Sequence, residues 1–336
     1  MGKLIGIGEA LIDMIPTETN KPIKDVAAFS PIVGGAPANV CGAFSKLSGE
    51  SQMITQLGDD PFGDKIIDTF REFSIGCDYI QRTDKANTAL AFVALSDNGG
   101  REFSFYRRPS ADMMMDESQV DEEWFKDAFA LHFCSVSLGD FPMKNAHYKA
   151  IEYAEKNGVL ISFDPNLRFN LWESKVKLKE AVREFVPFAD ILKVSDEELF
   201  FITGIEDEEQ ALRSLFQGKI KLIIYTKGSA GAYAYTKNIS AFADSLKVNA
   251  IDTTGAGDAF IGSFLYSLER HISGLIGKAN EINNRSINYC DYSFDELSEK
   301  ELKTMLEFSN RYCAKSVMKN GAIESYPTCE DMKADS

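Results

Sequence analysis

Ile251-Asp252-Thr253-Thr254-Gly255-Ala256-Gly257-Asp258-Ala259-Phe260 forms a glycine-rich turn that leads directly into an amphipathic helix. Apolar residues at positions 260, 261, 264, 265 and 268 make one continuous stripe after the turn. The first amides of a helix have no partner inside the helix and, with the helix dipole, favour a negative charge beside them. The stretch therefore predicts an anion site just ahead of residue 260, of the kind that holds a phosphate group.

The carboxylate that follows this turn indicates the chemistry. No lysine stands where G-x-x-x-x-G-K-[ST] requires one, so a P-loop is excluded. Asp258 would bind a phosphate poorly, but it could accept a proton from a hydroxyl that attacks the phosphate. The alternative is that Asp258 only stabilises the helix start. Because acidic residues stand at both ends of DTTGAGD, we favour the role as a base.

The hydrophobic pattern around this stretch predicts the fold class. Strand-like runs occur at 4–7, 130–136, 159–163, 190–194 and 221–226, and helical patterns occur at 146–157, 175–186 and 207–217. Strands that alternate with helices in this way are typical of an α/β protein with a mostly parallel sheet covered on both faces.

Two segments depart from this alternation. Residues 88–95 and 101–107 are strand-like and flank Asp97-Asn98-Gly99-Gly100, a strong hairpin signal. Together with 14–33 they predict a small β lid, so we divide the chain into a lid (14–33 and 88–112) and a main domain (1–13, 34–87 and 113–330). The polar, asparagine-rich residues 277–295 predict an exposed insertion between two helices, whose role stays open.

Further polar clusters follow predicted strands, where open α/β sheets place their ligands. Asp13 follows the first strand, Asp164-Pro165-Asn166-Leu167-Arg168 and Ser195-Asp196-Glu197-Glu198 follow later ones, and Thr226-Lys227-Gly228 follows another. Each could be turn or capping chemistry alone. A second glycine pair, in GGAPAN at 34–39, either admits a ligand beside Asn39 or only begins a helix. The repetition at strand ends favours one shared site.

Composition excludes several function classes. The 336 residues carry 36 basic and 51 acidic side chains, a net charge of −15, which argues against nucleic-acid partners. No apolar run approaches the roughly 18 residues that cross a membrane, and the N-terminus lacks a signal-peptide pattern. Six cysteines without a C-x-x-C pair indicate reduced thiols and a cytoplasmic location. Three isolated histidines argue against a zinc enzyme or a histidine-based hydrolase, and Gly6-Ile7-Gly8 fails the dinucleotide fingerprint.

DTTGAGD and GGAPAN together resemble the two signatures of the ribokinase-like (pfkB) carbohydrate kinases. REFSFYRRPSADM (101–113), SFDPNLR (162–168) and ILKVSDEEL (191–199) resemble the fructokinase branch of that family. The resemblance runs from about residue 3 to residue 328. It implies a three-layer αβα sandwich with a small β-sheet lid.

The resemblance also implies a role for individual residues. Asp258 would be the catalytic base, and the amides of Gly255, Ala256 and Gly257 would form the anion hole. The sugar would contact Asp13, Gly34, Gly35, Asn39, Arg107 and Asn166. The nucleotide would contact Thr226, Gly228, Gly231, Asn310 and Ala314. A monovalent cation would lie at Asp252, Thr254, Ser316, Gly321 and Ser325. The family's Asn-x-x-Glu motif has Ser195 in place of asparagine, so only Glu198 is expected to hold magnesium, through water.

The implied reaction is transfer of the γ-phosphoryl group of MgATP to the 6-hydroxyl of D-fructose, which gives fructose 6-phosphate and ADP. ATP and Mg²⁺ are the expected cofactors, with K⁺ as the candidate monovalent cation. Two alternatives stay open: a 2-keto-3-deoxygluconate or nucleoside kinase of the same family, and a sugar sensor without turnover. The exposed edge of the lid sheet predicts a homodimer. We expect a small-molecule sugar as substrate and no nucleic-acid or membrane partner.

Overall fold

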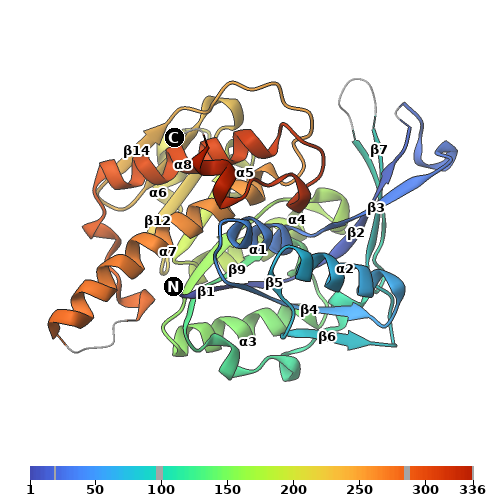
Figure 1. Ribbon diagram of the computed structural model, residues 1–336, viewed down its shortest axis with the longest axis horizontal. Helices are drawn as coiled ribbons and strands as arrows, with labels where there is room; N and C mark the ends of the chain where they lie inside the picture. The colour runs from blue at the N-terminus through green and yellow to red at the C-terminus, as the bar shows by residue number, and fades with distance from the viewer. Residues whose placement is uncertain (19, 96–100, 284–287, 335–336) are drawn as a thin grey trace.

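The computed structural model describes residues 1–18, 20–95, 101–283 and 288–334 (Figure 1). A ten-stranded sheet runs through the middle of the molecule in the order β14-β13-β12-β11-β10-β9-β1-β4-β5, with β6 paired to β4. Neighbouring strands are parallel except at β12–β13 and β13–β14. The strands are β1 (Lys3–Ile7), β4 (Ser51–Gly58), β5 (Ile75–Gly76), β6 (Ile80–Thr83), β9 (Ala128–Cys134), β10 (Leu160–Asp164), β11 (Ile191–Ser195), β12 (Leu222–Thr226), β13 (Ala232–Tyr235) and β14 (Ser240–Ala243).

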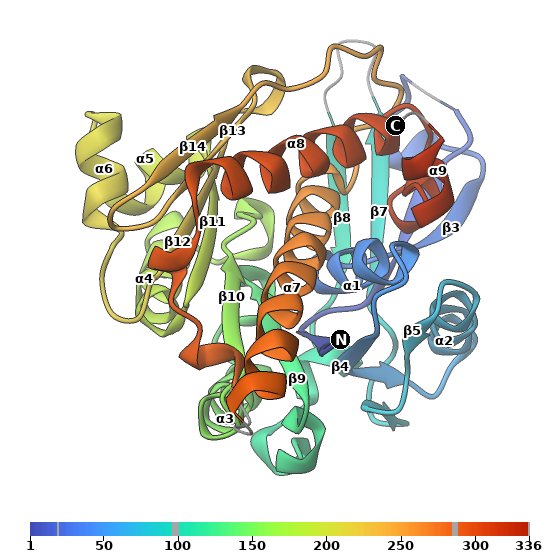
Figure 2. The same ribbon diagram turned by 60° about the vertical axis from the view of Figure 1, so that its left-hand side comes forward.

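Helices cover both faces of this sheet (Figures 1 and 2). Two separate buried clusters fill the layers: Phe44 and Phe264 belong to one, and Ala146 and Val182 belong to the other. One layer contains α1 (Ala36–Lys46), α2 (Pro61–Glu72), α7 (Ala256–Asn283), α8 (Glu299–Ser316) and α9 (Cys329–Lys333). The other contains α3 (Met143–Lys156), α4 (Lys175–Phe185), α5 (Asp196–Thr203) and α6 (Glu208–Ser214). The predicted three-layer αβα sandwich with a mostly parallel sheet is confirmed.

A second, four-stranded sheet stands beside the first, in the order β3-β2-β7-β8 (Figure 2). Its strands are β2 (Leu11–Pro16), β3 (Phe29–Gly34), β7 (Leu90–Leu95) and β8 (Arg101–Tyr106). The β7–β8 pair is antiparallel, with Leu95 opposite Arg101. The predicted turn at 97–100 lies outside the described residues. The small sheet is thus built from the two segments that the sequence predicted as a lid, with β2 beginning slightly earlier than expected.

The prediction of an insertion over 277–295 was wrong in its first part. Helix α7 continues to Asn283, and residues 284–287 are outside the described ranges. Short 3-10 turns over Tyr289–Asp291 and Phe294–Glu296 then lead to α8. The polar composition suggested a loop, but a helix that has already formed extends at little cost in free energy. Within the described ranges, every helix is too short or too polar to cross a bilayer.

Candidate active site

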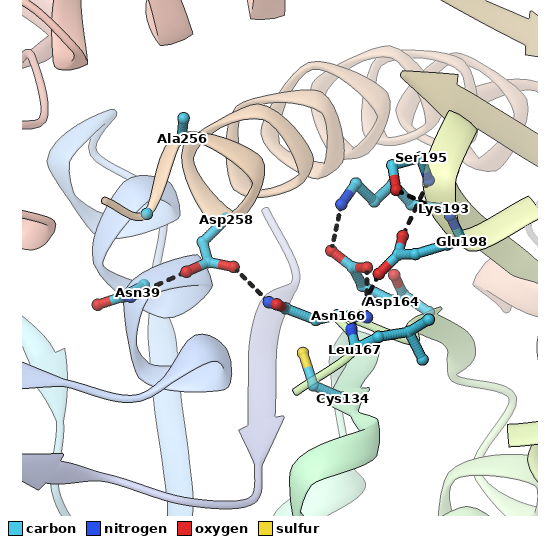
Figure 3. A network of polar contacts seen from close by, with 12 residues as sticks. Asn39, Cys134, Asp164, Asn166, Leu167, Lys193, Ser195, Glu198, Ala256 and Asp258 are labelled. Atoms are coloured by element: carbon cyan, nitrogen blue, oxygen red, sulfur yellow. Dashed lines mark hydrogen bonds and ion pairs between the residues drawn. The ribbon is translucent and has the colours of Figure 1, made fainter. Parts of the chain in front are cut away.

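Three distant segments meet at the carboxylate of Asp258 (Figure 3). Asp258 lies in the first turn of α7 and is 4% exposed. Its Oδ2 accepts a hydrogen bond from Asn39 Nδ2 at 2.8 Å, and its Oδ1 accepts one from Asn166 Nδ2 at 2.9 Å. Each carboxylate oxygen therefore has an amide donor, which fixes the orientation of the group. The structure brings together three residues that the sequence predicted for the site.

The environment of Asp258 makes it a stronger base than an exposed aspartate. Burial raises the pKa of its carboxyl above the ordinary value. The Asn39 and Asn166 amides oppose this effect, as do the positive charges of Arg168 and Lys193. A carboxylate with a raised pKa accepts a proton more readily, which suits a general base.

Backbone geometry places the two amides. Gly35 precedes α1 with φ +114°, and a Cβ there would collide with the carbonyl oxygen of Glu9, so this position needs glycine. Asn166 follows β10 with φ +43°, a left-handed conformation that asparagine tolerates. Asp164 supports this turn, because its Oδ1 accepts a hydrogen bond from the Asn166 amide at 3.1 Å.

The glycine turn ahead of α7 has the backbone that the sequence predicted. Gly255 has φ +69°, and Tyr326 Oη donates a hydrogen bond to its carbonyl oxygen at 2.8 Å. The Ala256 amide donates to the carbonyl oxygen of Thr253 at 3.2 Å. An anion hole at this helix start would therefore depend mainly on the amides of Gly255 and Gly257. Tyr326 was not selected from the sequence, since no motif marks it.

A buried ion pair lies beside this turn. Lys193 Nζ lies 2.8 Å from Asp164 Oδ2, and both side chains are almost fully buried. Burial raises the pKa of Asp164 to about 7, although the Lys193 ammonium opposes the shift. Burial acts to lower the pKa of Lys193, but the carboxylates of Asp164 and Glu198 more than offset it and raise that pKa. Sequence reasoning missed Lys193, whose signal was a charged residue inside the apolar run 190–194.

Glu198 serves as a helix cap in the structure. Its Oε2 accepts a hydrogen bond from the Ser195 amide at 2.9 Å, and Ser195 Oγ accepts one from the Glu198 amide at 3.3 Å. Its Oε1 accepts one from the Leu167 amide at 2.9 Å. Helix capping, the alternative considered from the sequence, thus accounts for the motif Ser195-Asp196-Glu197-Glu198. The Glu198 carboxylate also links α5 to the turn after β10. Within the described ranges, no three His, Cys, Asp or Glu side chains are grouped to hold a metal.

Of the predicted sugar contacts, Asp13 is half-buried on β2. A Cβ on Gly34 would collide with its carboxylate, so Gly34 makes room for Asp13. Arg107 is 6% exposed, and Nε and Nη2 of its guanidinium both donate to Oδ2 of Asp112 in a buried ion pair. It also donates to the carbonyl oxygen of Val136 at 3.3 Å and to Ser137 Oγ at 3.2 Å. Arg107 therefore contacts protein groups that join the small sheet to the large one.

The predicted nucleotide residues lie around β12 to β14 and on α8. Gly228 and Gly231 follow β12 with φ +52° and +104°. A Cβ on Gly228 would meet nothing within 4 Å, so this turn borders open space. Asn310 Nδ2 donates to the carbonyl oxygens of Ala243 and Asp244 at 3.0 and 3.1 Å, which ties α8 to the end of β14. Thr226 ends β12, and Ala314 is buried on α8.

The predicted cation residues lie ahead of α7, at the end of α8 and in the segment that follows α8. Asp252 Oδ1 accepts a hydrogen bond from the Thr254 amide at 2.9 Å, and its Oδ2 accepts one from the Gly321 amide at 3.0 Å. The hydroxyls of Ser316 and Ser325 donate to backbone carbonyl oxygens at 2.8 Å. Asp252 thus holds the loop after α8 against the glycine turn.

Residues 1–329 match the profile of the pfkB family carbohydrate kinases. The chain belongs to the pfkB family. It is 38% identical over 329 residues to a probable chloroplastic fructokinase-6 of Arabidopsis thaliana, covering 97% of this chain and 80% of that one. The ATP-bound fructokinase of Xylella fastidiosa superposes with a TM-score of 0.83 at 31% identity, covering 99% and 97% of the two chains. A double mutant of the Vibrio cholerae O395 fructokinase with fructose, ADP and a potassium ion bound gives a TM-score of 0.81 at 28% identity, covering 99% and 98%.

Membership of the pfkB family makes the protein a carbohydrate kinase. The site geometry fits that class, because phosphoryl transfer depends mainly on positioning and on neutralising charge. The site contains a fixed carboxylate beside a glycine-rich helix start.

Proposed function

We propose that the chain transfers the γ-phosphoryl group of ATP to the 6-hydroxyl of D-fructose and releases fructose 6-phosphate and ADP. The observation that carries this proposal is the Asp258 carboxylate, held by two amides in the first turn of α7. The similarity to fructokinases, one of them with fructose and ADP bound, supports fructose as the acceptor.

In this proposal, Asp258 accepts the proton of the sugar hydroxyl as that oxygen attacks phosphorus. The amides of Gly255 and Gly257, with that of Ala256, hold the transferring group at the positive end of α7. A general base of this kind contributes about 10² to 10⁴-fold to the rate. Asn39 and Asn166 keep the carboxylate oriented toward the hydroxyl.

The sugar would bind between the two sheets. Asp13, from the small sheet, and Asn39, from α1, would bind its hydroxyls, with Gly34 and Gly35 allowing close approach. A sugar offers little apolar surface, so discrimination would depend on buried polar partners that lose hydrogen bonds with a wrong substrate. The small sheet would exclude water and so prevent hydrolysis of ATP.

The nucleotide would extend from the glycine turn toward Thr226, Gly228 and Gly231, with Asn310 and Ala314 near the base. Mg²⁺ bound with ATP would neutralise phosphate charge. Magnesium usually keeps several waters and binds through phosphates and one or two carboxylates, so Glu198 would reach it through water. Potassium would lie at Asp252, Thr254, Ser316, Gly321 and Ser325, and the relative with potassium bound supports the choice of ion.

An ADP-release assay over a panel of acceptors tests this function. D-fructose should give the highest kcat/KM, and omission of sugar should reduce ADP release to background. A higher kcat/KM with 2-keto-3-deoxygluconate or with a nucleoside would show that fructose is not the preferred acceptor, although the chain would still be a kinase. Fructose binding in calorimetry without ADP release would favour a sensor and contradict the proposal.

We also propose a homodimer through the small sheet, whose edge strands β3 and β8 leave backbone groups for a second copy. Size-exclusion chromatography with light scattering should give about twice the chain mass of 37.3 kDa. A monomer at all concentrations would contradict this. The cytoplasmic location stays a prediction for cell fractionation to test, since one relative is named as chloroplastic.

A further inference from the structure

Lys193 places a buried positive charge beside the start of α7. It lies in β11 and is 6% exposed, and among the described residues it is the one lysine that is buried. A Cβ built on Gly257 would lie 3.2 Å from Lys193 Nζ. Figure 3 shows the lysine side chain reaching from β11 toward the first turn of α7. The ammonium therefore borders the space that a side chain at position 257 would occupy, beside the glycine turn.

The ammonium of Lys193 keeps donors that an anion could use. Removing an ammonium from water costs several kcal/mol by order of magnitude, and the neighbouring carboxylates of Asp164 and Glu198 offset that cost. An ammonium has three N–H donors, and the contact with Asp164 Oδ2 uses one. The adjacent helix start is also positive, so the two positive ends repel each other. An anion between them would accept hydrogen bonds from the remaining ammonium donors and would remove this repulsion.

Resting on the proposed function, we propose that Lys193 is a further catalytic residue, whose ammonium contacts the γ-phosphoryl group during transfer while Asp164 holds the lysine side chain in place. The phosphoryl group then lies between the amides of α7 on one side and Lys193 on the other. Asp164 links this group to the base, because it also supports the turn that carries Asn166. Asp164 is thus a positioning residue for the ammonium of Lys193 and, through Asn166, for the carboxylate of Asp258.

Replacement Lys193→Met tests the proposal through nucleotide binding as well as rate. The imido analogue of ATP and ADP differ by the γ-phosphoryl group, so their affinities, measured by calorimetry without sugar, report contacts to that group. The variant should lose most of the preference for the ATP analogue over ADP. Its kcat should fall by about 10² to 10³-fold, as when one donor to a developing negative charge is removed. Fructose affinity should change less than about twofold.

Two further variants separate this role from a structural one. Lys193→Met alone leaves Asp164 buried without its partner, which could prevent folding. The double variant Asp164→Asn/Lys193→Met removes both charges and should fold with the same loss of rate and of nucleotide preference. Lys221→Met is the matched control, because Lys221 Nζ pairs with Asp190 at 3.0 Å near the opposite ends of the strands. It should keep the nucleotide preference and the rate.

A double variant with kcat within about threefold of the unmodified protein, or with its preference for the ATP analogue intact, would overturn the proposal for Lys193. Absence of ADP release from the unmodified protein with every sugar would instead overturn the proposed function. The binding comparison would still decide the role of Lys193, because it needs no turnover.

Discussion

At the scale of single residues, Asp258 shows how the fold changes the acid–base properties of a common side chain. Its carboxylate is buried, which favours the protonated form, yet two amides donate to it and favour the charged form. The net result of these opposed effects is a carboxyl pKa above its ordinary value. From its position in the sequence alone, Asp258 could equally be an aspartate that only stabilises the start of a helix.

Replacement Asp258→Ala should abolish most turnover but leave sugar binding largely intact, because the hydroxyl loses its proton acceptor while other polar contacts remain. We expect kcat to fall by at least about 10²-fold. ADP-release kinetics and fructose calorimetry measure the two effects. Asp68→Ala is the control, since Asp68 is 78% exposed on α2. An unchanged kcat in Asp258→Ala would contradict the role as a base.

The two amides also predict a pH effect. Burial raises the pKa of Asp258 above 3.8, and the amides of Asn39 and Asn166 lower it. Replacement Asn166→Ala removes one of these donors, so the pKa should rise further. The base must be ionised to act, and activity is lost as pH falls through its pKa. The acidic limb of the kcat/KM profile should therefore move to higher pH. A limb that stays in place or moves to lower pH would show that this hydrogen bond does not set the pKa.

At the scale of elements, Gly255, which directly precedes α7, and Gly274, inside α7, have opposite effects. Gly255 has φ +69°, and a Cβ there would lie 2.5 Å from Tyr326 Oη and 2.9 Å from Ala322 Cβ. Gly274, in the helix interior, would have nothing within 4 Å of an added Cβ. The first glycine is required by conformation and close packing, whereas the second only weakens the helix.

Alanine at these two positions should therefore change stability in opposite directions. Gly255→Ala should lower the free energy of unfolding by about 1–3 kcal/mol and reduce kcat, because the turn must shift. Gly274→Ala should raise the free energy of unfolding by about 0.5–1 kcal/mol and leave kcat unchanged. Urea denaturation and ADP-release assays measure both. Equal effects at the two positions would show that the turn geometry does not matter.

At the scale of the whole molecule, Arg107 joins the two sheets. It follows β8 of the small sheet, and Nε donates to Asp112 Oδ2 at 3.0 Å while Nη1 donates to the carbonyl oxygen of Val136, just beyond β9. Ser137, which accepts from Arg107, donates to Glu9 Oε2 at 3.0 Å. Glu9 Oε1 in turn accepts from the Ala36 amide at the start of α1 at 3.2 Å. This buried network fixes the small sheet relative to the helix that carries Asn39.

Arg107→Met should destabilise the protein by about 3–5 kcal/mol, because it leaves the Asp112 carboxylate buried without its partner. The midpoint of urea unfolding measures this. Arg213→Met is the control, since its pair with Glu209 is exposed and should contribute less than about 0.5 kcal/mol. If Arg107→Met instead keeps its stability and raises the KM for fructose, the sugar contact implied by the resemblance would be the better account.

The amino-acid sequence by itself determined the elements of the fold and the central motif. Strands at 159–163, 190–194 and 221–226 were predicted to within about two residues, because alternation of apolar runs and helical stripes is a local property. The turn at Gly255 and the place of Asp258 at a helix start followed from local rules too. The length of α7 did not, since a polar composition says little about where a helix ends.

Only the tertiary structure decided which side chains meet. Asn39 and Asn166 are 219 and 92 residues from Asp258 in the chain, and no local pattern encodes that they share its carboxylate. The contacts of Arg107 with Val136 and Ser137 and the approach of Lys193 to Gly257 also depend on how strands are ordered and helices packed. Periodicity records which face of an element is buried, whereas the partner on that face is fixed by the packing of the whole chain.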